Sequence, residues 1–115
     1  MIHSLHHLAI IASSEASIAF YEKLGFCEYK RIKRNYDTVV LMNGPGFELE
    51  IFVDPNHTHK KDEPYGLRHF ALKVDNIEET VRELGLECGP IGNDWLGVRY
   101  AYIHDPDGLP IELHE

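Results

Sequence analysis

Short apolar-rich stretches with a period of two recur along the chain and predict β-strands. The first, residues 6–12 (HHLAIIA), places His7 on the face opposite Leu8 and Ile10, because successive side chains of a strand point to opposite sides. The other expected strands cover residues 26–34, 36–42, 47–53, 67–74, 86–91, 98–104 and 109–114. The pattern therefore favours a protein that is rich in β-sheet.

Two stretches have helical periodicity instead, with apolar residues every three or four positions. Their stripes are Ala16, Phe20 and Leu24 in the first, with Ile18 and Tyr21 alongside, and Ile77, Val81 and Leu84 in the second. We expect Ser13 or Ser14 to cap the first helix and Asp75 the second, because short polar side chains accept hydrogen bonds from the first turn. Gly25 and Gly85 follow the stripes and are expected to end both helices.

The chain contains one pattern twice, at an offset of 62 residues. Aligned on His7 and His69, both copies read His, apolar, Ala, apolar, any residue, then a small apolar residue. Each copy ends in Gly, apolar, any residue, apolar, Glu, apolar, which contains Glu50 in the first copy and Glu112 in the second. In both copies the Glu follows its His by 43 residues, so we expect equivalent structural positions.

Each copy has the expected order strand, helix and three strands. The modules are residues 1–53 and 67–115, and the polar, proline-containing stretch 54–66 links them. Because a half-size module cannot bury a sufficient core alone, we expect one domain over residues 1–115. The predicted fold class is α+β, with two paired βαβββ modules whose curved sheets face one another across a cleft.

Composition narrows the possible functions. A chain of 115 residues with 43% hydrophobic and 26% charged residues is typical of a globular protein, and no apolar run approaches the ~20 residues of a membrane span. The net charge of −8 argues against nucleic-acid and membrane partners and favours a small molecule. Residues 1–5 lead directly into a strand, and Cys27 and Cys88 match no paired spacing, so we expect reduced thiols and a cytoplasmic location.

The face away from the expected helices carries His7, Glu50, His69 and Glu112. Two imidazoles and two carboxylates suit a borderline divalent cation, and an octahedral ion would keep two positions open for catalysis. Taken singly, each residue is more often a surface or core residue than a ligand. The repetition of all four at one spacing favours a metal site.

Two neighbouring residues compete with this ligand set. His6 would lie on the opposite face, and its distance to Glu50 breaks the repeat, so we favour His7. Glu48 shares the face of Glu50, but its counterpart Pro110 cannot bind a metal. The other histidines have no repeat partner and are expected at the surface or supporting the site: His3, His57, His59, His104 and His114.

The motifs HHLAI, GFELEIF, LRHFALKV and DPDGLPIEL resemble the vicinal oxygen chelate superfamily, most closely its small bacterial glyoxalase I-like members. The resemblance covers nearly the whole chain and implies a cup-shaped half-barrel, the glyoxalase/bleomycin resistance/dioxygenase fold. It implies one divalent metal ion, nickel, cobalt or zinc, bound by His7, Glu50, His69 and Glu112. By analogy it also implies a homodimer.

The resemblance implies a lactoylglutathione lyase-like enzyme that acts on a hemithioacetal or small α-hydroxycarbonyl through a metal-chelated enediolate. Glu112, with Glu50 as its pseudo-symmetric partner, would carry the proton between two carbons. Alternatives are another metal-dependent member of the superfamily, such as an epimerase or a dioxygenase, and a module that only binds a small molecule. Superfamily epimerases usually carry Gln at the position of Glu50, and dioxygenases use two His and one carboxylate.

The chain departs from the glyoxalase I pattern at the positions that hold glutathione. Ile11 and Asp54 stand where that family has an Arg and an Asn. An apolar residue and an anion do not replace a cation and an amide toward a negatively charged tripeptide, which argues against glutathione. Arg99 is the best remaining candidate for binding an anionic substrate group.

Overall fold

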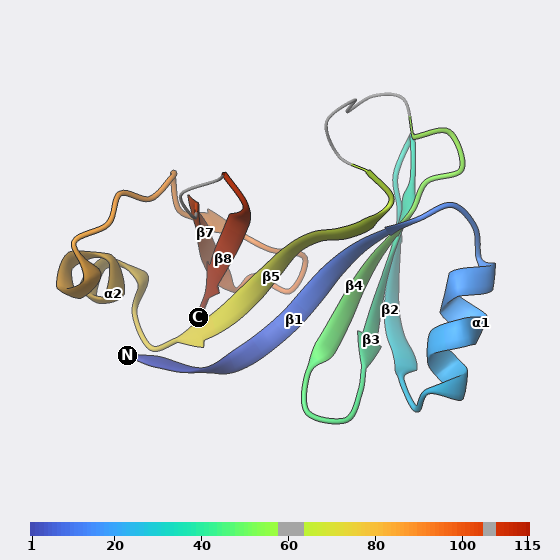
Figure 1. The fold of residues 1–115 in the computed structure, drawn as a ribbon, viewed down its shortest axis with the longest axis horizontal. Helices are drawn as coiled ribbons and strands as arrows, with labels where there is room; N and C mark the ends of the chain where they lie inside the picture. The colour runs from blue at the N-terminus through green and yellow to red at the C-terminus, as the bar shows by residue number, and fades with distance from the viewer. Residues whose placement is uncertain (58–63, 105–107) are drawn as a thin grey trace. The chain divides into compact units, whose positions relative to one another are not determined.

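The structure, a computed structural model, describes residues 1–57, 64–104 and 108–115 (Figure 1). Its elements are, in order, β1 (Ile2–Ala12), α1 (Ala16–Lys23), β2 (Cys27–Lys33), β3 (Thr38–Asn43), β4 (Glu48–Val53), β5 (Gly66–Val74), α2 (Ile77–Leu84), β6 (Gly92–Asn93), β7 (Arg99–His104) and β8 (Pro110–His114). This is the predicted βαβββ order, twice. The chain forms two compact units: the first unit is His7–Arg68, and the second unit is Met1–His6 with His69–Glu115.

In the first unit the strand order is β2-β3-β4-β1, with β3 antiparallel to both neighbours and β1 parallel to β4. Helix α1 covers one face of this sheet (Figure 1). The helix-facing cluster comprises Ala12, Ile18, Phe26, Val40, Met42, Leu49, Ile51 and Val53, with Leu8 and Ile10 packed against it. The predicted alternation of β1 and β4 is therefore confirmed.

The predicted stripe of the first helix is wrong. Phe20 and Leu24 are 56% and 55% exposed, whereas Ile18 is buried. The turn after α1 sets this orientation, because Gly25 has a φ of +102° and the Phe26 amide donates back to the Tyr21 carbonyl at 3.1 Å. Ile18 and the Tyr21 ring consequently face the sheet, with Tyr21 edge-on to Phe26.

In the second unit the strand order is β1-β5-β8-β7-β6, with β5 parallel to β8 and β7 antiparallel to β8 and β6. Helix α2 packs on the sheet through Ile77 and Val81 (Figure 1). The other members of this cluster are Leu72, Val74, Ala101, Ile103, Ile111 and Leu113. Residues 72, 111 and 113 thus lie on the face opposite His69 and Glu112, as the period of two predicts.

Two local predictions for the second unit are wrong. The expected strand over residues 86–91 is irregular, and β6 begins only at Gly92, because Pro90 lacks an amide hydrogen and Gly89 packs no side chain. The cap of α2 is Asn76, whose side chain accepts from the Glu79 amide at 2.9 Å.

Asp75, the expected cap, instead contacts His3 Nε2 at 2.6 Å at the surface. This hydrogen bond lowers the pKa of the Asp75 carboxyl. The two adjacent residues therefore have different roles. Asn76 caps α2, whereas Asp75, directly after β5, bonds to His3 near the start of β1.

Two stretches lie outside the described residues: 58–63 of the expected linker, which includes His59, and 105–107, which falls between the expected strands 98–104 and 109–114. The single domain with modules 1–53 and 67–115 stays a prediction. Within the described ranges, Cys27 and Cys88 are free and exposed. No helix in those ranges has the length and apolar composition needed to cross a bilayer.

Replacement of Asn76 by alanine is expected to lower the free energy of unfolding by about 1 kcal/mol, because the first turn of α2 loses its side-chain acceptor. Urea denaturation followed by circular dichroism measures this loss. Asp75→Ala is the matched control and should cost less, because an exposed ion pair contributes little. An equal or larger loss in the control would refute the assignment of the cap.

Gly44→Ala is expected to destabilise the first unit by about 1–3 kcal/mol through overpacking. A Cβ at Gly44 would lie 1.9 Å from the buried Phe26 ring, which has to move out of the helix-facing cluster. Gly89→Ala serves as the control, since its nearest contact would be 3.9 Å. Thermal melts of both variants test the difference, and indistinguishable midpoints would count against the packing.

Candidate functional site

His7 and Glu50 of the first unit lie on adjacent parallel strands, on the sheet face away from α1. The register pairs His7 with Glu48 and Ala9 with Glu50, and paired residues of parallel strands share a face. His7 is 5% exposed, and Ala9 is fully buried. Glu50 therefore lies beside Ala9, two residues along the strand from His7. The alanine side chain is too small to cover the carboxylate.

The surroundings of Glu50 are largely apolar. Its neighbour on the other side, in β3, is Leu41. The cluster on this face comprises Ala9, Ile11, Val39, Leu41 and Phe52, with Ile32 packed against it. A partly buried carboxylate above such a surface needs a polar or cationic partner, because desolvation penalises its charge.

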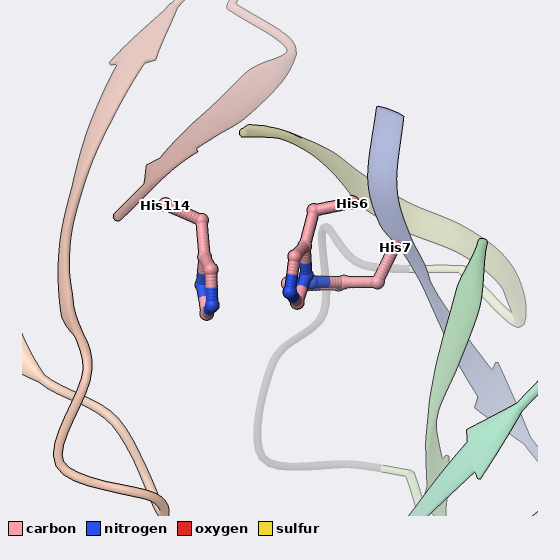
Figure 2. A group of neighbouring side chains, drawn as sticks. All are labelled: His6, His7 and His114. Atoms are coloured by element: carbon pink, nitrogen blue, oxygen red, sulfur yellow. The ribbon is translucent and has the colours of Figure 1, made fainter. Parts of the chain in front are cut away.

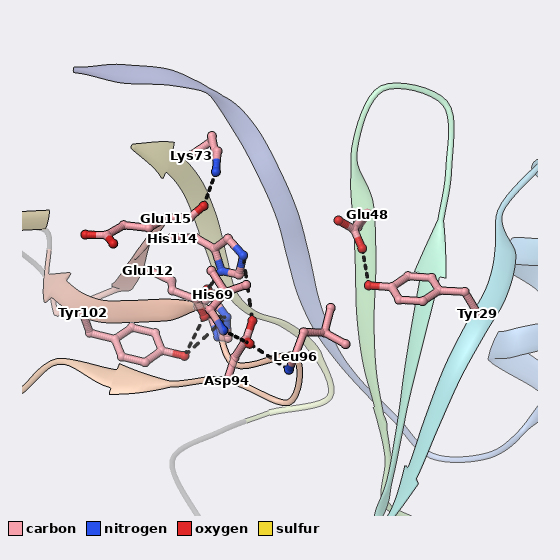
Figure 3. Close-up of polar contacts among 11 residues, drawn as sticks. Tyr29, Glu48, His69, Lys73, Asp94, Leu96, Tyr102, Glu112, His114 and Glu115 are labelled. Atoms are coloured by element: carbon pink, nitrogen blue, oxygen red, sulfur yellow. Dashed lines mark hydrogen bonds and ion pairs between the residues drawn. The ribbon is translucent and has the colours of Figure 1, made fainter. Parts of the chain in front are cut away.

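Glu48, the sequence competitor of Glu50, accepts a hydrogen bond from the Tyr29 hydroxyl (Figure 3). The donor comes from β2, so that this carboxylate is held toward the edge of the first unit. The contact gives Glu48 a structural partner within its own sheet.

Two arginines lie on the face of the first unit that carries Glu50. The guanidinium carbons of Arg34 and Arg68 lie 5.4 and 4.4 Å from the Phe52 ring centre. Arg34 also makes two bonds to Asp37, at 2.6 and 2.5 Å, and this pairing raises its pKa. Both guanidinium groups thus lie beside the face that carries Glu50.

His69 and Glu112 of the second unit repeat the geometry of His7 and Glu50. The β5–β8 register pairs Ala71 with Glu112, just as Ala9 pairs with Glu50, and His69 stands two residues before Ala71. His69 is 2% exposed and Glu112 is 5% exposed. The sequence repeat is therefore also a repeat of strand register around a buried alanine.

The side chains of His69 and Glu112 meet directly, with Nε2 of the imidazole 3.3 Å from Oε1 of the carboxylate (Figure 3). Two ligand atoms bound to one ion at about 2.0–2.2 Å, roughly 90–109° apart, are separated by about 2.8–3.6 Å. The observed separation lies in this range, and imidazole with carboxylate suits nickel, cobalt or zinc. These two residues therefore fit a divalent cation.

Glu112 has two further polar partners, Tyr102, which the sequence did not single out, and His114, which was expected at the surface or supporting the site. The Tyr102 hydroxyl donates to Oε1 at 3.3 Å and lies 3.5 Å from His69 Nε2. His114 Nδ1 is 2.9 Å from Oε2 (Figure 3). The strand pattern did contain a signal for both, because Tyr102 pairs with Glu112 across β7 and β8 and His114 follows Glu112 by two residues.

His114 is itself enclosed rather than exposed. Its Nε2 faces Asp94 Oδ2 at 3.8 Å (Figure 3), and its ring stacks on the ring of His6 with centres 3.7 Å apart (Figure 2). Asp94 is held in turn, because Oδ1 accepts from the Leu96 and Val98 amides. The structure thus gives His6 a partner within the second unit and places His114 against Glu112.

Arg99, the predicted substrate-binding residue, lies on the α2 side of β7. Its neighbours Ala101 and Ile103 on that side belong to the helix-facing cluster, whereas Tyr100 and Tyr102 alternate to the face of Glu112. Arg99 pairs with Glu78 of α2 and with Glu115. The geometry therefore gives no support to a substrate-binding role for Arg99, which stays a prediction.

The two positions that depart from the glutathione-binding pattern are both buried. Ile11 belongs to the apolar cluster of the first unit. Asp54 is 2% exposed, and its carboxylate lies 3.2 Å from His57 Nδ1. The His57 side chain therefore lies against Asp54, and neither Ile11 nor Asp54 supplies a cation for a substrate carboxylate.

Comparison with known proteins places this geometry in a family. The sequence model of the Glyoxalase/Bleomycin resistance protein/Dioxygenase superfamily matches residues 4–113. The uncharacterized protein YwkD of Bacillus subtilis (strain 168) is 40% identical over 126 aligned positions, which cover 100% of this chain and 98% of the relative. The uncharacterized protein YaeR of Escherichia coli (strain K12) is 37% identical, covering 96% and 95%.

Among solved structures, methylmalonyl-CoA epimerase from Mycobacterium tuberculosis has a similar fold, with a TM-score of 0.80 at 18% identity. The match covers 99% of this chain and 88% of the epimerase. At this identity the likeness concerns the fold, and it confirms the predicted fold class. The family model, which matches residues 4–113, and the relatives of 40% and 37% identity establish that this chain belongs to the Glyoxalase/Bleomycin resistance protein/Dioxygenase superfamily.

Proposed function

We propose that the protein is a metal-dependent, glyoxalase I-like lyase or isomerase acting on a small α-hydroxycarbonyl or hemithioacetal. The observation that carries this proposal is the duplicated register of His and Glu around Ala9 and Ala71. A structural duplication explains repeated apolar positions, but it does not by itself require repeated ligand-type residues. Retention of all four is the pattern expected of one shared task.

The residues proposed to hold the ion are His7, Glu50, His69 and Glu112, from one chain or from two. Members of the superfamily typically bind a divalent metal, and this donor set suits nickel, cobalt or zinc. When bound, such an ion acts as a Lewis acid that stabilises negative charge on two adjacent oxygens of the substrate. The carboxylates and imidazoles would hold both ion and substrate on rigid strands.

Glu112 is the proposed proton carrier. Its carboxylate is almost entirely shielded from solvent, so that a proton taken from a substrate carbon is not lost to bulk water. In a hemithioacetal the proton leaves the carbon that bears the hydroxyl and returns to the adjacent carbonyl carbon, while the hydroxyl proton passes to the other oxygen. The product is a 2-hydroxy thioester, and no oxidant or reductant is needed.

The thiol part of the substrate is proposed to differ from glutathione. Buried Ile11 and the Asp54–His57 pair leave the two glutathione-binding positions of glyoxalase I without a cation or a free amide. A smaller or less acidic thiol avoids this requirement. An α-hydroxycarbonyl compound without a thiol fits the same chemistry, because it also offers two adjacent oxygens.

Glu112→Gln is expected to lower turnover at least about 100-fold, because the amide cannot accept the carbon proton. The assay uses nickel-, cobalt- and zinc-loaded protein with methylglyoxal and a panel of thiols, and elemental analysis of the same samples reports bound metal. Glu48→Gln is the control, since its amide can still accept from Tyr29 and turnover should be retained. Unchanged turnover in Glu112→Gln would contradict the proposed role.

The alternatives predict other products from the same protein. Oxygen consumption with a catechol and Fe(II) would support a dioxygenase. Exchange of a solvent proton at the α-carbon of an acyl thioester would support an epimerase. Tight binding of a small molecule without bound metal would support a binding module.

A further inference from the structure

We propose that His114 is a positioning residue that fixes the carboxylate of Glu112 and thereby determines which of its two oxygens serves the reaction. The inference rests on the proposed function of Glu112 and adds a residue to it. His114 lies on the same strand and the same face as Glu112, two residues further along β8. The sequence repeat gives His114 no equivalent histidine in the first copy.

The contact between His114 and Glu112 has a defined direction. An ionised carboxylate can only accept, so the distance of 2.9 Å between Nδ1 and Oε2 requires the proton to lie on Nδ1 of His114. The other oxygen, Oε1, faces His69 Nε2 and the Tyr102 hydroxyl. The two oxygens of Glu112 are therefore distinguished, one by a supporting imidazole and one by the proposed metal ligand.

The imidazole of His114 is restrained on three sides within the second unit. Glu112 lies at Nδ1, Asp94 lies at Nε2, and the ring of His6 stacks on its face at 3.7 Å with planes 28° apart (Figures 2 and 3). Asp94 is held by two backbone amides, at 2.9 and 2.8 Å. A donor restrained in this way holds the carboxylate in one orientation, as supporting hydrogen bonds do for metal ligands.

The sequence repeat is broken at this residue. The residue that stands two places after Glu50 is Phe52, whereas His114 stands two places after Glu112. The neighbours on the adjacent strand also differ in polarity. Leu41, which cannot donate a hydrogen bond, lies beside Glu50, whereas Tyr102 lies beside Glu112. Two equivalent carboxylates thus have different surroundings, and only Glu112 of this pair has a donor on its own strand at that position.

Three substitutions of His114 separate its two nitrogens. In His114→Asn the amide nitrogen replaces Nδ1 and keeps the donor to Glu112, whereas in His114→Gln it replaces Nε2 and keeps only the side toward Asp94. His114→Phe removes both and reproduces the residue of the first repeat. His3→Gln, at an exposed surface histidine, is the control for a general effect of losing an imidazole.

With nickel-loaded protein and the best substrate found, His114→Phe and His114→Gln are expected to lower kcat about 10–100-fold with little change in KM, and His114→Asn to recover most of the loss. Elemental analysis and thermal melts should show retained metal and similar midpoints. Equal loss in the Asn and Gln variants would overturn the proposal. Loss of metal in all three would also overturn it, since His114 would then be a ligand.

A second readout needs neither metal nor turnover. In the 15N NMR spectrum of the wild-type protein, Nδ1 of His114 should be protonated and hydrogen-bonded, and Glu112→Ala should abolish that signature. An unprotonated Nδ1 would refute the positioning contact even if the enzyme is active. A protonated Nδ1 in a protein inactive toward every substrate tested would uphold the contact while the proposed function fails.

Discussion

The parallel pairing of the first and last strand in each βαβββ unit is the constraint on which the candidate site depends. Parallel neighbours present paired residues on the same face, so the β1–β4 and β5–β8 registers decide which side chains share a face with the imidazoles. A shift of either register by one residue would turn Glu50 or Glu112 toward the helix. The apolar alternation of these strands opposes such a shift, because it would expose Leu49, Ile51 or Leu113.

Burying the ionisable side chains of His69 and Glu112 is unfavourable unless polar partners or a cation compensate the loss of solvation. His69 and Glu112 are nearly inaccessible to water, and moving a carboxylate into such surroundings is unfavourable without compensating partners. Tyr102 and His114 provide hydrogen bonds to Glu112, and a divalent ion would provide the opposite charge. The strands supply rigidity, and the polar partners supply orientation, so that the second unit holds a preorganised carboxylate.

Much of the fold could be predicted from the sequence, because both the repeat and the alternation of strand residues follow from the spacing of residue types along the chain. The helix-facing positions of β1, β4, β5 and β8 followed from a period of two, and the ligand-type residues followed from their identical spacing. The orientation of α1 did not follow, because the turn at Gly25 and Phe26 sets it rather than the stripe. The choice of Asn76 over Asp75 as a cap depended on a partner, His3, that lies far away in the sequence.

The site was predictable only as far as the repeat extended. His7, Glu50, His69 and Glu112 were proposed as metal ligands because they occur at the same spacing in both copies. His114 was expected only at the surface or supporting the site, because its equivalent in the first copy is Phe52. Asp94 was not predicted, because it comes from an irregular segment. Residues that differ between the two copies distinguish the surroundings of Glu112 from those of Glu50. Their contacts become apparent only when the strands are paired in register.

Calorimetric titration of nickel into the metal-free protein and into His7→Ala and His69→Ala variants, one from each unit, tests whether the four proposed ligands bind a single ion. We expect one ion per chain in the wild-type protein and loss of that same binding event in both variants. Two independent binding events, each abolished by only one variant, or undiminished affinity in His69→Ala, would contradict a single metal centre built from both repeats.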